Sequence, residues 1–186
     1  MGKTKQLLKV GGKTLVERVV QEALKSDLDE VVLVLGHRAG TVRDVLFPGL
    51  QHARLRIVEN PHYREGMSSS IRVGLGAVEE RADHVMILLA DMPHINAHII
   101  DLLLAGYLAS RKTLGAISVR GRRSLPVILG RAWYGALHDL KGDVGARALF
   151  DAFRNEVCLV DAPPTYDDLD LDTPEDYQKA LSENHE

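Results

Sequence analysis

Apolar and polar residues follow one another along this chain in two alternating kinds of segment. Short apolar runs rich in Val, Ile and Leu are typical of buried strands, and longer stretches with apolar residues about every three or four positions are typical of amphipathic helices. Predicted strands cover residues 30–36, 53–60, 84–90, 114–121, 124–130 and 156–161. Predicted helices cover residues 14–26, 39–49, 68–82, 96–110, 145–155 and 174–184.

This order of elements predicts the fold class. Strands that alternate with helices form βαβ units, so we expect an α/β fold with a mostly parallel sheet between two layers of helices. Residues 114–130 depart from the order, because two strands follow each other across a short basic turn and predict a hairpin. We therefore expect a mixed sheet. No Pro/Ser-rich linker or block of charge divides the chain, which predicts a single domain over residues 1–186.

Composition and charge exclude several classes of protein. The net charge is −3, which does not suggest a nucleic-acid-binding protein, and no apolar run approaches the ~20 residues that cross a bilayer. We therefore expect a cytoplasmic protein that binds neither nucleic acid nor membrane. A single cysteine, Cys158, excludes an internal disulfide and suits a reducing compartment.

The stretch LLADMPHI, residues 88–95, places a carboxylate directly after an apolar strand. In open α/β sheets, ligands bind beyond the carboxyl ends of the strands. Asp91 could hold Mg²⁺ there, because Mg²⁺ takes one or two protein carboxylates and leaves its other positions to water and phosphates. Alternatively, Asp91 caps the loop into the next helix. The stretch alone leaves both interpretations open.

A second acidic stretch, DLDLDTPEDY, covers residues 168–177. Its Thr173 and Pro174 are typical of a helix start, with the threonine at the N-cap. Capping does not explain Asp170 and Asp172, which share one face of an extended segment. Two acidic sites at strand ends could bind one metal ion and a triphosphate between them.

Five segments together resemble the MobA-like nucleotidyltransferases, and among these the molybdenum cofactor (molybdopterin) cytidylyltransferases. The segments are residues 1–19 (MGKTKQLLKVGGKTLVERV), 66–75 (GMSSSIRVGL), 88–95, 141–149 (KGDVGARAL) and 168–177. The resemblance implies a three-layer, Rossmann-like nucleotidyltransferase fold of the glycosyltransferase-A type. It also implies Mg²⁺-dependent transfer of CMP, rather than GMP, from an NTP to a molybdopterin-type acceptor, with release of pyrophosphate. A molybdoenzyme or its chaperone is a further expected partner.

The same resemblance assigns roles to residues of the metal and phosphate site. It makes Asp91 the principal metal ligand and places the family's final acidic pair on Asp170 and Asp172, with Asp172 favoured as the second ligand. Lys5 is expected on the triphosphate, where it would offset charge on the leaving pyrophosphate.

Two further segments are expected to bind the base and the acceptor. Ser70 is expected beside the base, and Gly66 would let the backbone approach it closely. Asp143, Gly145 and Arg147 are expected at the acceptor's phosphate. In the alternative interpretation, Ser68 or Ser69 and Asp143 merely cap the helices that follow them.

The start of the chain departs from the family pattern. Family members begin with a strand and a Gly-rich turn, roughly L-A-A-G-x-S-x-R-M-G-x-x-K, and only the last part is matched here, by MGKTK. We therefore expect that the first strand is missing and that these 186 residues alone have little nucleotidyltransferase activity. Two other functions stay open: a sugar- or polyol-phosphate nucleotidyltransferase, and a non-catalytic nucleotide-binding or docking relative. The missing loop favours the docking protein, and the acidic pair favours an enzyme.

Overall fold

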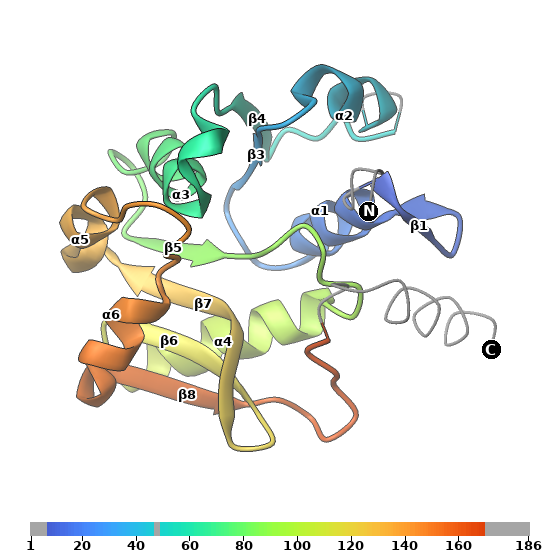
Figure 1. Ribbon diagram of the computed structural model, residues 1–186. Coiled ribbons are helices and arrows are strands. Elements are labelled where there is room, and N and C mark those ends of the chain that lie inside the picture. The colour runs from blue at the N-terminus through green and yellow to red at the C-terminus, as the bar shows by residue number, and fades with distance from the viewer. Residues whose placement is uncertain (1–6, 47–48, 170–186) are drawn as a thin grey trace.

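Strands and helices alternate along most of the chain (Figure 1), as the sequence predicts. The computed structural model describes residues 7–46 and 49–169. Within them the strands are β1 (Lys9–Val10), β2 (Lys13–Thr14), β3 (Val31–Leu35), β4 (Leu55–Glu59), β5 (His84–Ile87), β6 (Leu114–Val119), β7 (Arg122–Gly130) and β8 (Val157–Asp161). The α-helices are α1 (Leu15–Lys25), α2 (Ala39–Leu46), α3 (Met67–Gly76), α4 (Ala97–Ser110), α5 (Tyr134–His138) and α6 (Arg147–Ala152).

Parallel and antiparallel pairs both occur in the sheets. Strands β3 and β4 pair in parallel, and a four-stranded sheet has the order β5-β7-β6-β8. In that sheet β7 runs antiparallel to both its neighbours, whereas β8 runs parallel to β6. The predicted hairpin is confirmed: β6 turns into β7 through Arg120 and Gly121, whose φ angles are 51° and 74°, as a tight two-residue turn requires. Among the described strands, none pairs with the second edge of β3 or of β5.

Helices cover both faces of the strands, which gives three layers. Residues of α1, α2 and α4 form one hydrophobic core with β3, and α4 lies behind the four-stranded sheet in Figure 1. Residues of α3, α5 and α6 form a second core on the other face, around β6 and β7. The observed architecture confirms the predicted α/β nucleotidyltransferase-like fold with a mixed sheet. None of the helices in the described ranges is long and apolar enough to cross a membrane.

Helix α1 is fixed at both ends by side chains. At its start, the Thr14 hydroxyl accepts the Glu17 N–H, and the Glu17 carboxylate accepts the Thr14 N–H at 2.7 Å, which is a capping box. At its end, the Arg54 guanidinium donates to the carbonyl oxygens of Leu24, Ser26 and Leu28. The last carbonyls of a helix have no partner within it. Arg54 therefore stabilises the end of α1 and joins it to the start of β4.

Three predicted elements are shorter than the sequence suggests. Strand β5 ends at Ile87 rather than at residue 90, because its partner β7 presents Pro126 at the next position and proline has no N–H for the ladder. The predicted helix over residues 68–82 ends at Gly76, and the one over 145–155 begins at Arg147 and ends at Ala152. Asp91 consequently lies in a turn beyond β5 and not at the last position of a strand.

Replacing Arg54 by methionine should lower the free energy of unfolding by about 2–3 kcal/mol, because hydrogen bonds from a charged donor to several helix carbonyls would be lost. Urea unfolding measures this change. Arg56→Met is the matched control, since the exposed Arg56 donates only to the carbonyl oxygen of Ala77. The control should lose less than about 1 kcal/mol. Equal losses in the two variants would contradict the capping role.

Candidate functional site

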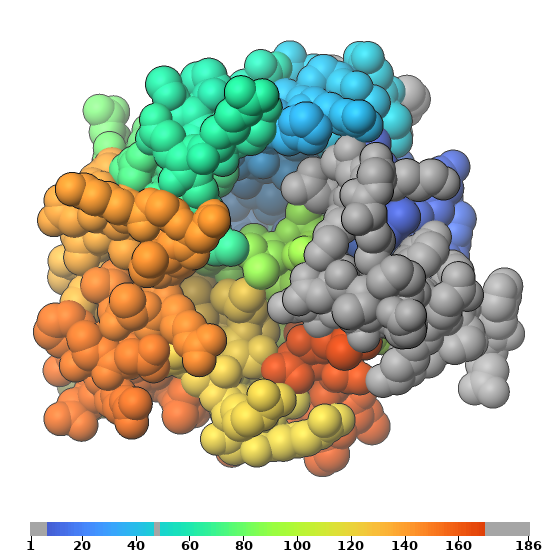
Figure 2. All heavy atoms as spheres, viewed as in Figure 1, coloured from blue at the N-terminus to red at the C-terminus, as the bar shows by residue number. Residues whose placement is uncertain are grey.

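The predicted site residues that the structure describes lie in the segments that follow β4, β5 and β7. Figure 2 shows a hollow on one face of the molecule, between α3, the orange segment that precedes α6 and the green segment that follows β5. Leu88, Leu89 and Ala90 pack against the same core as Leu35 at the end of β3. The backbone leading to Asp91 is therefore held by the core rather than by strand pairing.

Asp91 is a partly buried carboxylate in this turn. Within residues 7–46 and 49–169, no group donates a hydrogen bond to it and no cation pairs with it. The cap of α4 is Asn96, whose side-chain oxygen accepts the Ile99 N–H at 3.1 Å. The alternative in which Asp91 caps this helix is therefore wrong. Its carboxylate is available to a ligand or a metal ion.

The segment that leads to the second acidic stretch lies beside the segment after Asp91. A cavity of about 280 Å³ separates them, lined by His94, Asn96, His98, Ile99, Pro163, Thr165, Tyr166 and Asp167. Tyr166 is buried in the same core as Met92. Asp170, Asp172 and Lys5 themselves lie outside the described residues. Residues 163–167 thus lie close to the segment that follows Asp91.

A metal ion at this place would depend on few protein ligands. In the part of the chain that the structure describes, no three His, Cys, Asp or Glu side chains gather into a metal-binding group. Zinc takes three or four such ligands, whereas one or two carboxylates can hold Mg²⁺ or a similar hard cation. Asp91 is one described residue that fits this role.

The start of α3 is packed tightly against residues 142–143. Gly66 has a φ of +98°, and a Cβ on it would lie 2.3 Å from the carbonyl carbon of Gly142. The Ser68 N–H donates to the Gly142 carbonyl at 3.1 Å, and the Met67 N–H donates to the Asp143 carboxylate at 3.1 Å. The first N–H groups of α3 therefore already have partners within the protein and are not free to bind an anion.

Asp143 caps a helix, but a different one from the helix expected. It accepts from the first residue of α3, whereas the N-cap of α6 is Ala146 and has no side-chain hydrogen bond. The other capping alternative is also wrong, because the N-cap of α3 is Gly66 and no serine side chain caps it. A sequence pattern reports local neighbours, and Asp143 and Met67 are 76 positions apart.

Arg72 holds the same two segments together, a role for which no sequence motif provides a signal. Its guanidinium donates to the Leu140 carbonyl at 2.5 Å and to the Glu65 carboxylate at 3.3 Å. It also lies 3.4 Å from the Ser68 hydroxyl. A cation that bridges a backbone carbonyl and a carboxylate fixes the segment before Gly142 against α3.

Ser70 is joined to the ends of β3 and β4 through Asn60, a second residue that sequence reasoning missed. Asn60 is 2% exposed, and its side-chain amide donates to the Ser69 hydroxyl at 2.8 Å and to the Ser70 hydroxyl at 3.0 Å. Its backbone N–H donates to the Leu35 carbonyl at 2.7 Å. An Asn directly after an apolar strand is the only signal that could have pointed to it.

The expected acceptor residues do not all lie together. Gly145 is close to the start of α3, because a Cβ on it would lie 3.2 Å from the Met67 sulfur. The structure thus brings Gly66, Asp143 and Gly145 together. Arg147 lies further out on α6: its side chain is 86% exposed, and its Nε is 3.8 Å from the Asp151 carboxylate.

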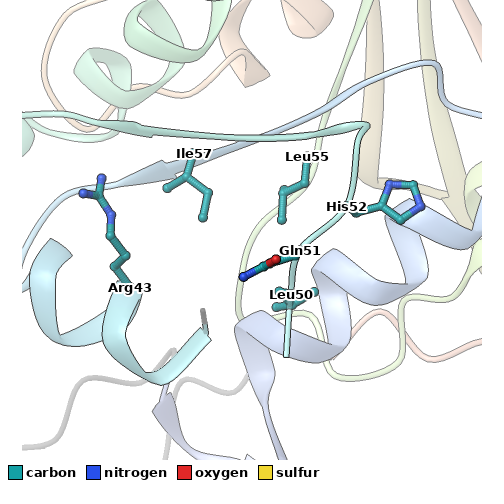
Figure 3. A pocket seen from close by; sticks show the side chains of 6 residues that line it. All are labelled: Arg43, Leu50, Gln51, His52, Leu55 and Ile57. Carbon is teal, nitrogen blue, oxygen red and sulfur yellow. The ribbon is translucent and has the colours of Figure 1, made fainter. Parts of the chain in front are cut away.

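A cavity of about 340 Å³ lies apart from these residues, between α2 and β4 (Figure 3). Its lining consists of Arg43, Leu50, Gln51, His52, Leu55 and Ile57. The Arg43 guanidinium is paired with the Glu59 carboxylate at 2.7 Å. The lining contains none of the predicted site residues and no acidic residue, so this cavity does not suit a metal-bound nucleotide.

Comparison with known proteins gives similarities over nearly the whole chain. Residues 1–157 match the family model of the MobA-like NTP transferase domain. The purine catabolism protein PucB of Bacillus subtilis (strain 168) is 25% identical over 195 residues, which cover 95% of this chain and 87% of PucB. The crystal structure of a homologue of Mycobacterium tuberculosis Rv0371c, from Mycobacterium sp. strain JC1, superposes with a TM-score of 0.83 at 26% identity, covering 98% of this chain and 89% of that one. Rv0371c of M. tuberculosis H37Rv in complex with manganese gives a TM-score of 0.79 at 26% identity, covering 97% and 93%.

Gly66→Ala should lower the free energy of unfolding by at least about 2 kcal/mol, because a methyl group would meet the Gly142 backbone and strain a positive φ. Gly76→Ala in the same helix is the control, since a Cβ there has nothing within 4 Å. The control should be neutral or stabilising by up to about 1 kcal/mol. Thermal and urea unfolding compare the two variants. An unchanged Gly66→Ala protein would show that residues 142–143 can move away from α3 without cost.

Proposed function

Because this chain belongs to the MobA-like NTP transferase family, we propose that it transfers a nucleoside monophosphate from an NTP to a molybdopterin-type phosphorylated acceptor. The family assignment confirms the resemblance inferred from the sequence, and nucleotidyl transfer from an NTP is the chemistry it supports. The proposal adds the acceptor and a preference for CTP over GTP, both of which come from the resemblance to molybdenum cofactor cytidylyltransferases. A molybdoenzyme or its chaperone would then receive the product.

The observation that carries the proposal is the carboxylate of Asp91 in the turn after β5, which has no partner among the described residues. Partly buried carboxylates normally have hydrogen-bond or ionic partners, so one without a described partner indicates a ligand. Asp91 would hold Mg²⁺ or a similar divalent cation, and Asp172 and Asp170 would complete the metal site. When bound, such a cation neutralises charge on the triphosphate. The manganese complex of Rv0371c supports a divalent cation in this fold.

The remaining groups would bind and orient the two substrates. Ser70 and Gly66 would face the nucleotide base, and Lys5 would contact the triphosphate. Asp143, Gly145 and Arg147 would lie along the acceptor. A phosphate oxygen of the acceptor attacks the α-phosphorus of the NTP, a new P–O bond forms, and the bond to the β-phosphate breaks to release pyrophosphate. Positioning and charge stabilisation supply the catalysis, and no protein nucleophile is needed.

Pyrophosphate release with molybdopterin, Mg²⁺ or Mn²⁺ and each of the four NTPs tests this function. It is measured on these 186 residues and on a chain extended by a family-like strand and Gly-rich turn, because the shorter chain is expected to have little activity. CTP should support the fastest release, with GTP slower by at least about tenfold, which one or two hydrogen bonds to the base can provide. Omitting the acceptor is the control and should abolish release. Turnover with a sugar or polyol phosphate in place of molybdopterin would overturn the acceptor, and faster turnover with GTP would overturn the base preference.

Asp91→Asn should reduce turnover at least about 100-fold, because the amide loses the charge that binds the cation. The free energy of unfolding should change by less than about 1 kcal/mol, since no described group depends on this carboxylate. Asp83→Asn is the matched control: Asp83 precedes β5 and is exposed, 3.4 Å from Arg131. The control should keep full activity. Full activity of Asp91→Asn would remove this residue from the metal site.

A further inference from the structure

We propose that Asn60 is a positioning residue that makes the Ser70 hydroxyl a hydrogen-bond donor to the base of the bound nucleotide. The inference rests on the proposed NTP-binding function. It adds a residue that none of the predicted roles includes, and it states which kind of base atom Ser70 can meet: a carbonyl oxygen or an unprotonated ring nitrogen, which accept hydrogen bonds.

The orientation of the Asn60 amide follows from the backbone around it. Its Oδ1 lies 2.9 Å from the backbone nitrogen of His62, and a backbone N–H can only donate. The oxygen must therefore face His62, and Nδ2 must face the two serines. If the amide were reversed, its Nδ2 hydrogens would face the His62 N–H, so two donors would meet with no acceptor between them. No solvent could relieve this contact, because Asn60 is only 2% exposed. Its two Nδ2 hydrogens go to Ser69, at 2.8 Å, and to Ser70, at 3.0 Å.

Ser69 and Ser70 accept from the same amide but differ in where their own protons go. The Ser69 hydroxyl lies 3.0 Å from the His62 carbonyl and 2.8 Å from the Gly66 carbonyl, so its proton has an acceptor in the backbone. Ser69 is also 1% exposed. Its hydroxyl is fully used inside the protein.

The Ser70 proton has no such acceptor among the residues that the structure describes. Ser70 is only partly buried and lies on α3 at the end of β3 and β4, to which Asn60 ties it. Because Asn60 occupies one lone pair of the hydroxyl, the proton is directed away from the amide. The Ser70 hydroxyl can therefore donate its hydrogen bond to a bound molecule, whereas the Ser69 hydroxyl already donates to the backbone.

The geometry can be tested first without any ligand, by NMR of the Asn60 side-chain amide in the whole chain. Ser70→Ala should shift one of the two Nδ2 proton resonances, and Ser69→Ala should shift the other. If Ser70→Ala moves neither resonance, the contact does not exist in solution and the proposal is overturned.

The donor role is tested by a double-mutant cycle on the affinity for CTP with Mg²⁺, measured by calorimetry. In Asn60→Asp a carboxylate, which can only accept, replaces the amide donor, so the Ser70 proton should turn toward it. Asn60→Asp and Ser70→Ala should each weaken binding about tenfold, and the double variant should be no weaker than either, because both remove the same donor. Ser69→Ala is the control and should keep its affinity.

The pH dependence separates a donor role from a merely structural one. Lowering the pH below the pKa of the carboxyl group introduced by Asn60→Asp, which NMR of this variant measures, should protonate that group. The protonated group can again donate, and the affinity of Asn60→Asp should recover, relative to the unmodified chain, while that of Ser70→Ala does not. Additive losses in the cycle, or no recovery at low pH, would overturn the inference. If the unmodified chain bound no NTP, both the proposed function and this inference would fail. Additive losses in a chain that binds NTP would overturn the inference alone.

Discussion

The close approach of Gly66 to Gly142 is the constraint on which the arrangement of the candidate site depends. The two backbones can touch only because Gly66 has no side chain at the contact and adopts a positive φ, whereas a Cβ on Gly142 would meet nothing within 4 Å. Because the backbones are this close, Gly142 and Asp143 accept hydrogen bonds from the first N–H groups of α3, which have no partners within the helix. The Arg72 guanidinium also donates a charge-assisted hydrogen bond to the Leu140 carbonyl oxygen. The expected base-binding and acceptor-binding segments are consequently parts of one packed unit.

The lack of a described partner distinguishes Asp91 from three other acidic side chains near the site. Asp143 accepts a backbone N–H, Glu65 faces Arg72, and Asp151 faces Arg123 at 3.0 Å. These carboxylates are used to hold the fold. Asp91 is only partly exposed and has no such partner among the described residues, which is the usual condition of a carboxylate that serves a ligand. The distinction rests on the structure, because all four carboxylates look equally available in the sequence.

The polar network around Asn60 links the sheet to α3, which carries the proposed base-binding Ser70. A single buried amide connects the end of β3, through its own N–H, with two successive hydroxyls of α3. Buried amides of this kind are stable only when all their hydrogen bonds are made, and they therefore fix orientation as well as position. This network gives neighbouring serines different tasks, one in the fold and one toward the ligand.

The sequence determined the elements whose signals are local. The apolar, β-branched run at 30–36, the helical pattern of 96–110 and the two strands joined by a turn at 114–130 appear as β3, α4 and the β6–β7 hairpin, within a few residues. The family and the candidate role of Asp91 also followed from short motifs. The short elements β1, β2 and α5 were missed, because two to five residues are too few to show a period.

Only the tertiary structure decided which groups partner one another across long stretches of chain. Strand β5 ends at Ile87 because Pro126 of the neighbouring strand has no N–H to donate. Asp143 accepts a hydrogen bond from α3 rather than from the helix that follows it. The tertiary structure also revealed Arg72 and Asn60 as the residues that hold the site together. Side-chain periodicity reports burial and local hydrogen bonds, but the partner of a polar group 68 or 76 positions away is set by how the layers pack.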